Sequence, residues 1–167
     1  MAKIARKLLA HYINAAPPVE GQPAAEAVYV RLGKDLEEYN PELSAEVESK
    51  KNILGESSIN ISSYEKTGSV EPYYAEKGDA LFERLQAILD EGLVLDDLLT
   101  DVVDVKLWET KAANGYPAVK EEAYIEVKSY GGDTTGYQIP FDLHYTGVKT
   151  KGYFDTATKT FKTEAGA

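Results

Sequence analysis

The chain contains 167 residues with a mass of 18.4 kDa, no cysteine and only two histidines. The lack of cysteine excludes disulfides, thiolate zinc sites, iron–sulfur clusters and a cysteine nucleophile, and two histidines are too few for a multi-histidine metal site. The formal net charge of −10 argues against a protein that grips nucleic acid or coats an anionic membrane, since both partners are polyanions.

The N-terminal region reads as two short strands. Strands are predicted over 8–13 and 28–32, where apolar and β-branched residues gather. A proline-rich loop over 15–26 separates them. The whole chain, 1–167, has a length that favours a single domain. It contains no run of the roughly 18–20 apolar residues that a membrane span requires, so no membrane partner is expected.

The segment 35–57 stands out because it is long, acidic and poor in apolar residues. Pro41 and Gly55 interrupt it, and neither a helical nor a strand period is visible. Loops of this length are uncommon in compact domains and are usually either functional or disordered. The sequence therefore predicts a long loop or arm here, followed by a strand over 58–64.

One helix is predicted, over 79–91. Asp79 is a good N-cap, and Gly92 supplies a helix stop. The apolar residues between them recur at the helical period and form a stripe wide enough to cover one face of a small β-sandwich or barrel. A strand over 101–108 follows. The stripe consists of Leu81, Phe82, Leu85, Ile88 and Leu89.

The last third of the chain is typical of antiparallel β structure. Residues 137–145 alternate apolar with polar or proline positions, and 122–128 do the same, so the two segments predict a long hairpin. Pro140 cannot donate a ladder hydrogen bond, which indicates an edge or a bulge at that point. Residues 152–154 and 159–161 predict a shorter hairpin.

Charge is distributed unevenly along the chain. Residues 1–34 carry five basic and two acidic side chains, and 35–58 carry two basic and seven acidic ones. Residues 59–109 carry four basic and twelve acidic side chains, whereas 110–167 are balanced with seven of each. A charge run is usually a solvated face. Opposite poles also allow copies of one chain to associate head to tail.

Motifs of enzymes are lacking. No nucleophile elbow, P-loop or dinucleotide fingerprint occurs, and no cofactor is expected. Asp96, Asp97, Asp101 and Asp104 lack the spacing of a calcium loop and are interpreted as a solvated acidic turn that leads into a strand. Tyrosines could build a sugar-binding platform, but packing in the core and at interfaces is the simpler interpretation. They are Tyr73, Tyr74, Tyr124, Tyr130, Tyr137 and Tyr145.

Four stretches in order give the chain a specific resemblance. The chain resembles the major tail (tail tube) proteins of long-tailed, non-contractile phages of Gram-positive bacteria, from about residue 30 to about residue 161. The stretches that carry the resemblance are VRLGKDLEEYN over 30–40, EVESKKNILGE over 46–56, VEPYYAEKGD over 70–79 and YGGDTTGYQIPF over 130–141.

The resemblance implies an architecture and a role. It implies a mainly β (α+β) fold, an antiparallel β-sandwich or barrel flanked by one α-helix with a long extended loop. Such subunits form hexameric rings that stack into a hollow tube in the virion, and DNA leaves the capsid through the lumen without specific binding. Other tail proteins at the tube ends, namely tape measure, terminator and baseplate, are further expected partners.

Candidate interface residues follow from this expectation. The arm would reach a neighbouring copy, with an apolar pair beside two lysines as its anchor: Lys50, Lys51, Asn52, Ile53, Leu54 and Gly55. The polar faces of the long hairpin would supply part of a lumen lining that repels phosphate, through Glu122, Glu126, Gln138 and Asp142. Two alternatives stay open: the tube of a phage-derived bacteriocin or similar particle, and a monomeric carbohydrate-binding β-sandwich.

Overall fold

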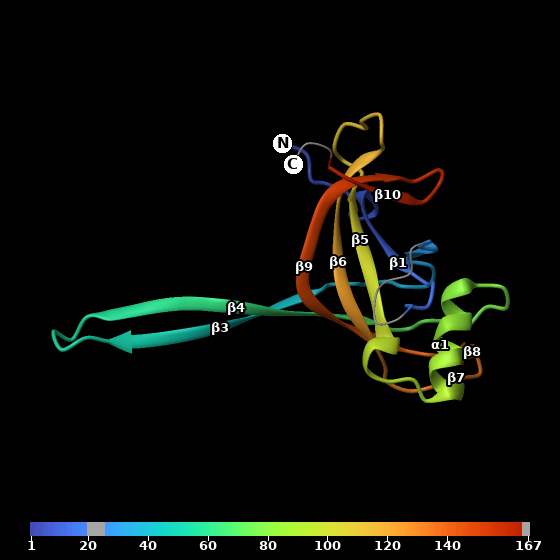
Figure 1. Ribbon diagram of the computed structural model, residues 1–167, viewed down its shortest axis with the longest axis horizontal. Helices are drawn as coiled ribbons and strands as arrows, with labels where there is room; N and C mark the ends of the chain where they lie inside the picture. Colours follow the sequence, from blue (N-terminus) through green and yellow to red (C-terminus); the bar gives the residue numbers. More distant parts are fainter. Residues whose placement is uncertain (20–25, 165–167) are drawn as a thin grey trace.

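The computed structural model describes residues 1–19 and 26–164. Its strands are β1 (Leu9–Asn14), β2 (Tyr29–Leu32), β3 (Glu42–Lys51), β4 (Ser57–Val70), β5 (Leu99–Lys106), β6 (Tyr116–Val127), β7 (Gly131–Asp133), β8 (Gly136–Gln138), β9 (Phe141–Asp155) and β10 (Thr160–Thr163). An eight-stranded antiparallel sheet forms the body and one long projection (Figure 1). Its main path runs β2-β1-β5-β6-β9-β4-β3, with β10 paired to β9. A separate two-stranded sheet joins β7 to β8. The mainly antiparallel β fold with one α-helix confirms the predicted fold class.

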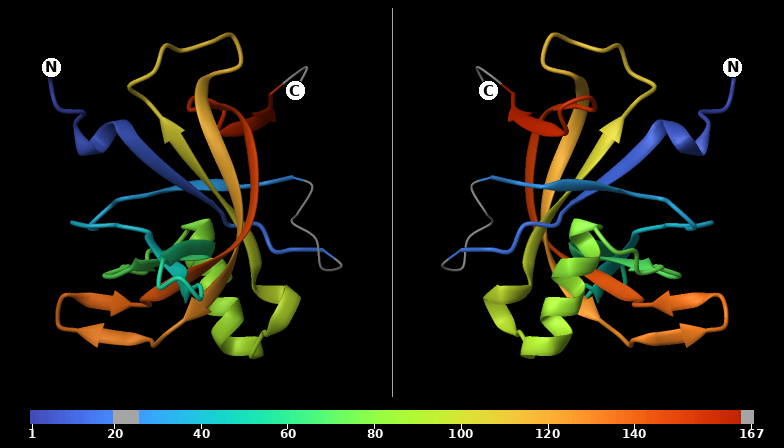
Figure 2. Two further views of the ribbon diagram at one scale, coloured as in Figure 1. Left: turned by 90° about the vertical axis from the view of Figure 1, so that its left-hand side faces the viewer. Right: turned by 90° about the vertical axis from the view of Figure 1, so that its right-hand side faces the viewer.

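Helix α1 (Ala80–Glu91) forms where the sequence predicts it. The Asp79 carboxylate accepts a hydrogen bond from the Leu81 amide at 3.1 Å, and Gly92 ends the helix with a φ of 63°. Leu81 and Leu85 are fully buried against the sheet, as the apolar stripe requires. Two short 3-10 helices, η1 (Arg6–Leu8) and η2 (Leu95–Leu98), precede β1 and β5. Helix α1 and the β7–β8 hairpin lie at the end of the sheet opposite β10 (Figure 2).

The main sheet buries residues on both of its faces. The larger core lies between the sheet and α1, and includes Ile13, Val102, Ile125 and Leu143. We call this side the helix face. The second core lies on the other face, under β10, and centres on Phe154. A bulge between Glu121 and Ala123 interrupts the β6–β9 register, and β9 bends over its length (Figure 1).

Arg84 fastens the helix to the sheet from within the core. Its guanidinium donates to the carbonyl oxygens of Asn14 at 3.2 Å, Ala16 at 3.1 Å and Leu99 at 2.6 Å. Burial lowers the pKa of Arg84 to about 10, with the Asp101 carboxylate opposing that shift. The charge therefore serves to bind carbonyl groups at the ends of β1 and η2.

Two sequence predictions are wrong in the structure. Residues 35–57 do not form a long loop, because β3 occupies Glu42–Lys51 and pairs along its length with β4. Residues 137–145 are not one strand, since β8 ends at Gln138 and β9 begins at Phe141. Between them, the Ile139 amide donates to the Tyr73 carbonyl at 3.0 Å, outside the main ladder. Of the predicted proline-rich loop 15–26, residues 20–25 lie outside the described residues.

Candidate assembly surfaces

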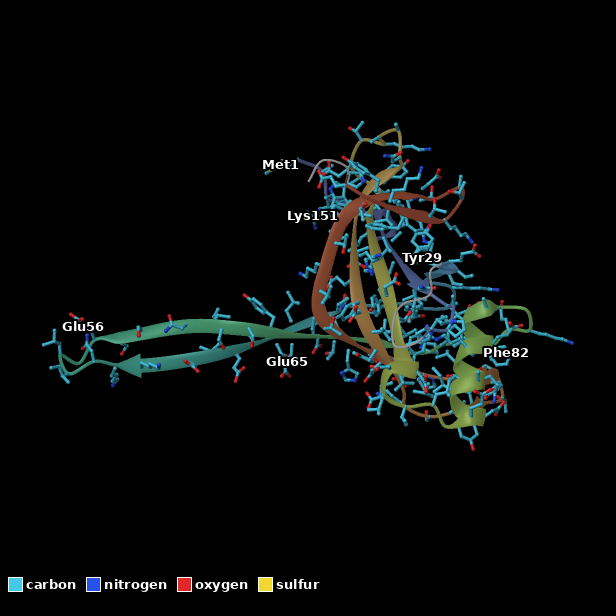
Figure 3. The ribbon with its side chains drawn as sticks, in the orientation of Figure 1. Met1, Tyr29, Glu56, Glu65, Phe82 and Lys151 are labelled. Carbon is cyan, nitrogen blue, oxygen red and sulfur yellow. The ribbon has the colours of Figure 1, made fainter. Side chains whose placement is uncertain are left out.

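The β3–β4 hairpin forms an arm that projects from the body. We define the arm as residues 42–66. Each β3 residue adds about 3.3 Å, so ten residues span about 33 Å. All ten β3 residues are exposed. Figure 3 places Glu56 at the far end of the arm and Glu65 near the body. Only the root of the arm is supported by the body, where β4 pairs with β9 over residues 67–70.

The tip of the arm is an ordered turn built by Asn52. Its side-chain oxygen accepts hydrogen bonds from the amides of Leu54 at 2.9 Å and Glu56 at 3.0 Å. Gly55 takes a φ of 83°, which a glycine adopts without strain. The turn leaves Ile53 fully exposed and Leu54 77% exposed. The six predicted interface residues, 50–55, therefore lie together at the end of the arm, where Lys50 and Lys51 close β3.

The arm is amphipathic across its two faces. Cross-strand pairs place Leu43, Val47, Ile59, Ile61 and Tyr64 on one face, which continues the helix face of the sheet. All five side chains are more than half exposed. The opposite face carries Glu42, Glu46, Glu48 and Glu65. An apolar face that is buried in the body thus continues along the arm, where none of the described residues covers it.

A partly buried polar cluster joins the root of the arm to the body. The Lys66 ammonium on β4 lies 2.5 Å from Glu121 Oε1 on β6 and 3.9 Å from Asp104 Oδ2 on β5. Asp104 Oδ1 lies 2.6 Å from His11 Nδ1 on β1, and Arg6 Nη2 lies 2.9 Å from His11 Nε2. We call these five residues the root cluster. It connects the N-terminal segment to the strand that enters the arm.

Two tyrosines complete the surroundings of Lys66. Its ammonium lies 4.5 Å from the centre of the Tyr145 ring, and the hydroxyls of Tyr145 and Tyr39 share a 2.8 Å hydrogen bond. Burial raises the pKa of both hydroxyls well above the usual range. The Tyr39 ring also packs on Gly68, where an added Cβ would overlap the hydroxyl. The root is therefore tightly packed as well as ionic.

The candidate lumen residues are only partly brought together. Glu126 and Asp142 form a direct cross-strand pair on the face opposite the helix, and Glu122 lies on that face at the bulge. Gln138 belongs to the separate β7–β8 sheet, so the expectation that it shares a strand with Asp142 is wrong. His144 Nε2 lies 2.8 Å from Glu126 Oε2, and Lys128 Nζ lies 4.0 Å from Asp142 Oδ2. The face is therefore closer to neutral than its carboxylates alone suggest.

The aspartates of the predicted acidic turn have two different environments. Asp96 and Asp97 are exposed in η2, as expected. Asp101 is buried, and it accepts hydrogen bonds from the Tyr29 hydroxyl at 2.6 Å and the Asn14 amide at 3.1 Å. Asp104 belongs to the root cluster. The interpretation of a solvated turn is wrong for these last two residues, because β5 begins at Leu99 and carries them into the sheet.

The tyrosines do not gather into one platform. Tyr145 lies on the helix face of β9, whereas Tyr124 lies on the opposite face of β6. Tyr73 packs edge-on against Phe141. Its hydroxyl donates to the Asp79 carboxylate at 2.5 Å. Tyr73 and Tyr145 therefore pack against the core at separate places, and Tyr130 is 70% exposed.

A basic cleft lies between the η1–β1 segment and the chain that follows β2. It has a volume of about 500 Å³ and is rimmed by Arg6, Lys7, Arg31 and Lys34. Glu37 is the single carboxylate among the described residues that line it. Lys34 pairs with Glu76 at 2.5 Å, whereas the other three cations form no ion pair within residues 1–19 and 26–164. Its floor is largely apolar and includes Leu9, Leu32, Leu36 and Tyr39.

The curved sheet, the flanking helix and the arm together form a fold that is similar to that of a solved tail tube. The chain is similar to the SPP1 tail tube, a hybrid structure from solid-state NMR and cryo EM. The TM-score is 0.62 and the identity 19%, over 93% of this chain and 83% of that chain. No protein-family model and no curated protein sequence matches the chain. None of the helices within residues 1–19 and 26–164 has the length and apolar character needed to cross a bilayer.

Sequence reasoning located the arm tip but not the root cluster. Its members are scattered from Arg6 to Glu121, so no local motif marks them. The sequence gives only a weak signal for two of them. Lys66 shares the apolar face of β4, and Glu121 is a charged residue at a buried position of β6. The sheet order that unites them depends on long-range pairing of β1 with β5 and β4 with β9.

Proposed function

We propose that this chain is the subunit of a phage tail tube. In this proposal, copies form hexameric rings that stack into a hollow tube in the virion, and DNA passes through the lumen during ejection. The role is structural rather than catalytic, and no cofactor takes part. The tube would belong to a long-tailed, non-contractile phage of a Gram-positive host, with tape measure, terminator and baseplate proteins at its ends.

One observation carries the proposal beyond fold similarity. The apolar face of the arm continues the buried helix face, yet it has no cover within the described residues. Burial of apolar surface is worth roughly 25 cal/mol per Å², so a second copy that covers this face gains substantial stability. The sheet also ends in two open edge strands, β2 and β3, which pairing between copies would remove.

The polar face opposite the helix supports a passive lumen. Glu122, Glu126 and Asp142 lie there beside His144 and Lys128, so positive charge is offset by carboxylates. Such a lining lacks the cationic groove that releases counterions from phosphate and thereby holds DNA. In the proposal this face points into the tube, and DNA slides past it.

Sedimentation of assemblies tests the role of the arm. The double substitution Ile53→Asp with Leu54→Asp places two charges on exposed side chains, so the monomer should fold with an unchanged Tm. Assembly should be lost, because the charges cannot be buried against another copy. Val94→Asp with Leu95→Asp is a matched control, since these neighbours are 60% and 79% exposed on the body, away from the arm. Wild-type sedimentation by the tip variant would contradict the proposed anchor.

A further inference from the structure

The basic cleft has the composition of a binding site for an extended acidic segment. Arg6, Lys7 and Arg31 have no carboxylate partner within residues 1–19 and 26–164. The apolar floor lies between them. A strand that alternates acidic and apolar side chains would match both features, because its two faces would meet the rim and the floor separately.

Strand β3 of the arm has this alternation. Glu42, Glu46 and Glu48 point to one face of the strand, and Leu43 and Val47 to the other. Its outer backbone edge is unpaired, because β3 ends the sheet. A single element thus offers acidic side chains, apolar side chains and free backbone groups to a partner.

The occupant must come from a second copy. The arm projects away from the body of its own chain, and its β3 residues are all exposed (Figure 1). β2, which borders the cleft, and β3 end the sheet at its opposite edges. Contact between unlike edges is a head-to-tail interface, which closes into rings or continues along a stack.

We propose that the basic cleft is the docking site for the acidic β3 strand of the arm of a second copy. The inference rests on the proposed function, since it names the acceptor surface for an arm that joins subunits. Glu42, Glu46 and Glu48 meet the cationic rim, and Leu43 and Val47 meet the floor. The basic start and the acidic middle of the chain thereby become two halves of one interface.

The cleft is held in position before it binds. The Arg6 guanidinium donates to the carbonyl oxygens of Leu9 at 2.7 Å and Tyr39 at 3.0 Å. Arg31 donates to the Lys7 carbonyl at 3.1 Å. Side chains that are already ordered lose little conformational entropy on binding, which favours association. Arg6 also contacts His11 of the root cluster, so the acceptor cleft and the root of the donor arm share one packed unit.

Charge reversal tests the pairing. One variant carries Lys7→Glu with Arg31→Glu in the cleft, a second carries Glu46→Lys with Glu48→Lys in the arm, and a third carries all four changes. The critical concentration for assembly is measured by sedimentation of the full-length chain. Like charges across an interface cost several kcal/mol, so each single-surface variant should require an about tenfold or higher concentration. The critical concentration of the variant with all four substitutions should return toward the wild-type value.

A matched control separates pairing from net charge. Lys159→Glu with Lys162→Glu changes the charge by the same amount as the cleft variant, at exposed positions around β10. Melting curves confirm that every variant folds. Unchanged assembly by both single-surface variants, with normal wild-type tubes, would overturn the docking site and leave the tube intact. If the single-surface variants lose assembly and the variant with all four substitutions does not recover it, the pairing with β3 would be overturned. A wild type that stays monomeric would overturn the proposed function and the docking site together.

Discussion

Removal of the Lys66 ammonium should weaken the fold at the root of the arm. Lys66→Met keeps much of the aliphatic length but leaves Glu121 without its cation. The Glu121 side chain is only 5% exposed, its Oε1 lies 2.5 Å from Lys66 Nζ, and its Oε2 has no hydrogen-bond partner among the described residues. The carboxylate would then be buried, charged and poorly solvated.

The magnitude follows from the burial of the pair. Deleting one partner of a buried ion pair costs about 3–5 kcal/mol. The Lys66 side chain keeps 16% exposure, which places the expected loss near the lower end, about 3 kcal/mol. For a chain of this size, each kcal/mol lowers the Tm by about 2–4 °C, so the shift should be about 6–12 °C.

Urea and thermal unfolding below the assembly concentration measure this loss. Lys34→Met is the matched control, because Lys34 and Glu76 are also 2.5 Å apart while their side chains are 72% and 48% exposed. Exposed pairs contribute little, so the control should melt with the wild type. Replacing Glu121 by Met as well should recover most of the loss, because no unpaired charge remains. Equal melting of the Lys66 and Lys34 variants would refute the reasoning.

Three further predictions concern the helix, the arm root and the lumen. Asp79→Ala removes the cap of α1 and the acceptor of the Tyr73 hydroxyl, and should cost about 1–2 kcal/mol in urea unfolding. Gly68→Ala should cost about 1–3 kcal/mol, because the new methyl group overlaps the buried Tyr39 hydroxyl; an unchanged unfolding midpoint would contradict this packing. Converting Glu122 and Glu126 to Lys should leave tubes intact and slow DNA ejection, and unchanged ejection kinetics would count against a lumen-facing role.

An element of the fold could be predicted from sequence where a single residue fixes the local backbone conformation at its end. Asp79 and Gly92 bound the helix as expected, because capping and a left-handed stop are local effects. Pro140 marked the break between β8 and β9, although the two were predicted as one strand. The turn after Asp155 could also be predicted, because an aspartate carboxylate readily caps its own turn. In the structure it accepts a hydrogen bond from the Ala157 amide at 2.9 Å, before β10 begins.

The arm could not be recognised as a hairpin from its own residues. Leu43, Val47 and Ile59 look scattered in sequence, because serine, glutamate and alanine separate them. Their pattern becomes clear only after β3 and β4 are paired, when they gather on one face. Exposed strands whose partner is another chain lack the burial signal on which strand prediction depends. The root cluster has no local sequence signal for a related reason, since long-range strand pairing alone brings its charges together.

Electron microscopy of the purified wild-type chain tests the central claim most directly. The proposal that the chain is a tail-tube subunit predicts hexameric rings and hollow stacked tubes, with the arm of each copy in contact with a neighbour. Images that show only monomers, across protein concentration and ionic strength, would contradict it.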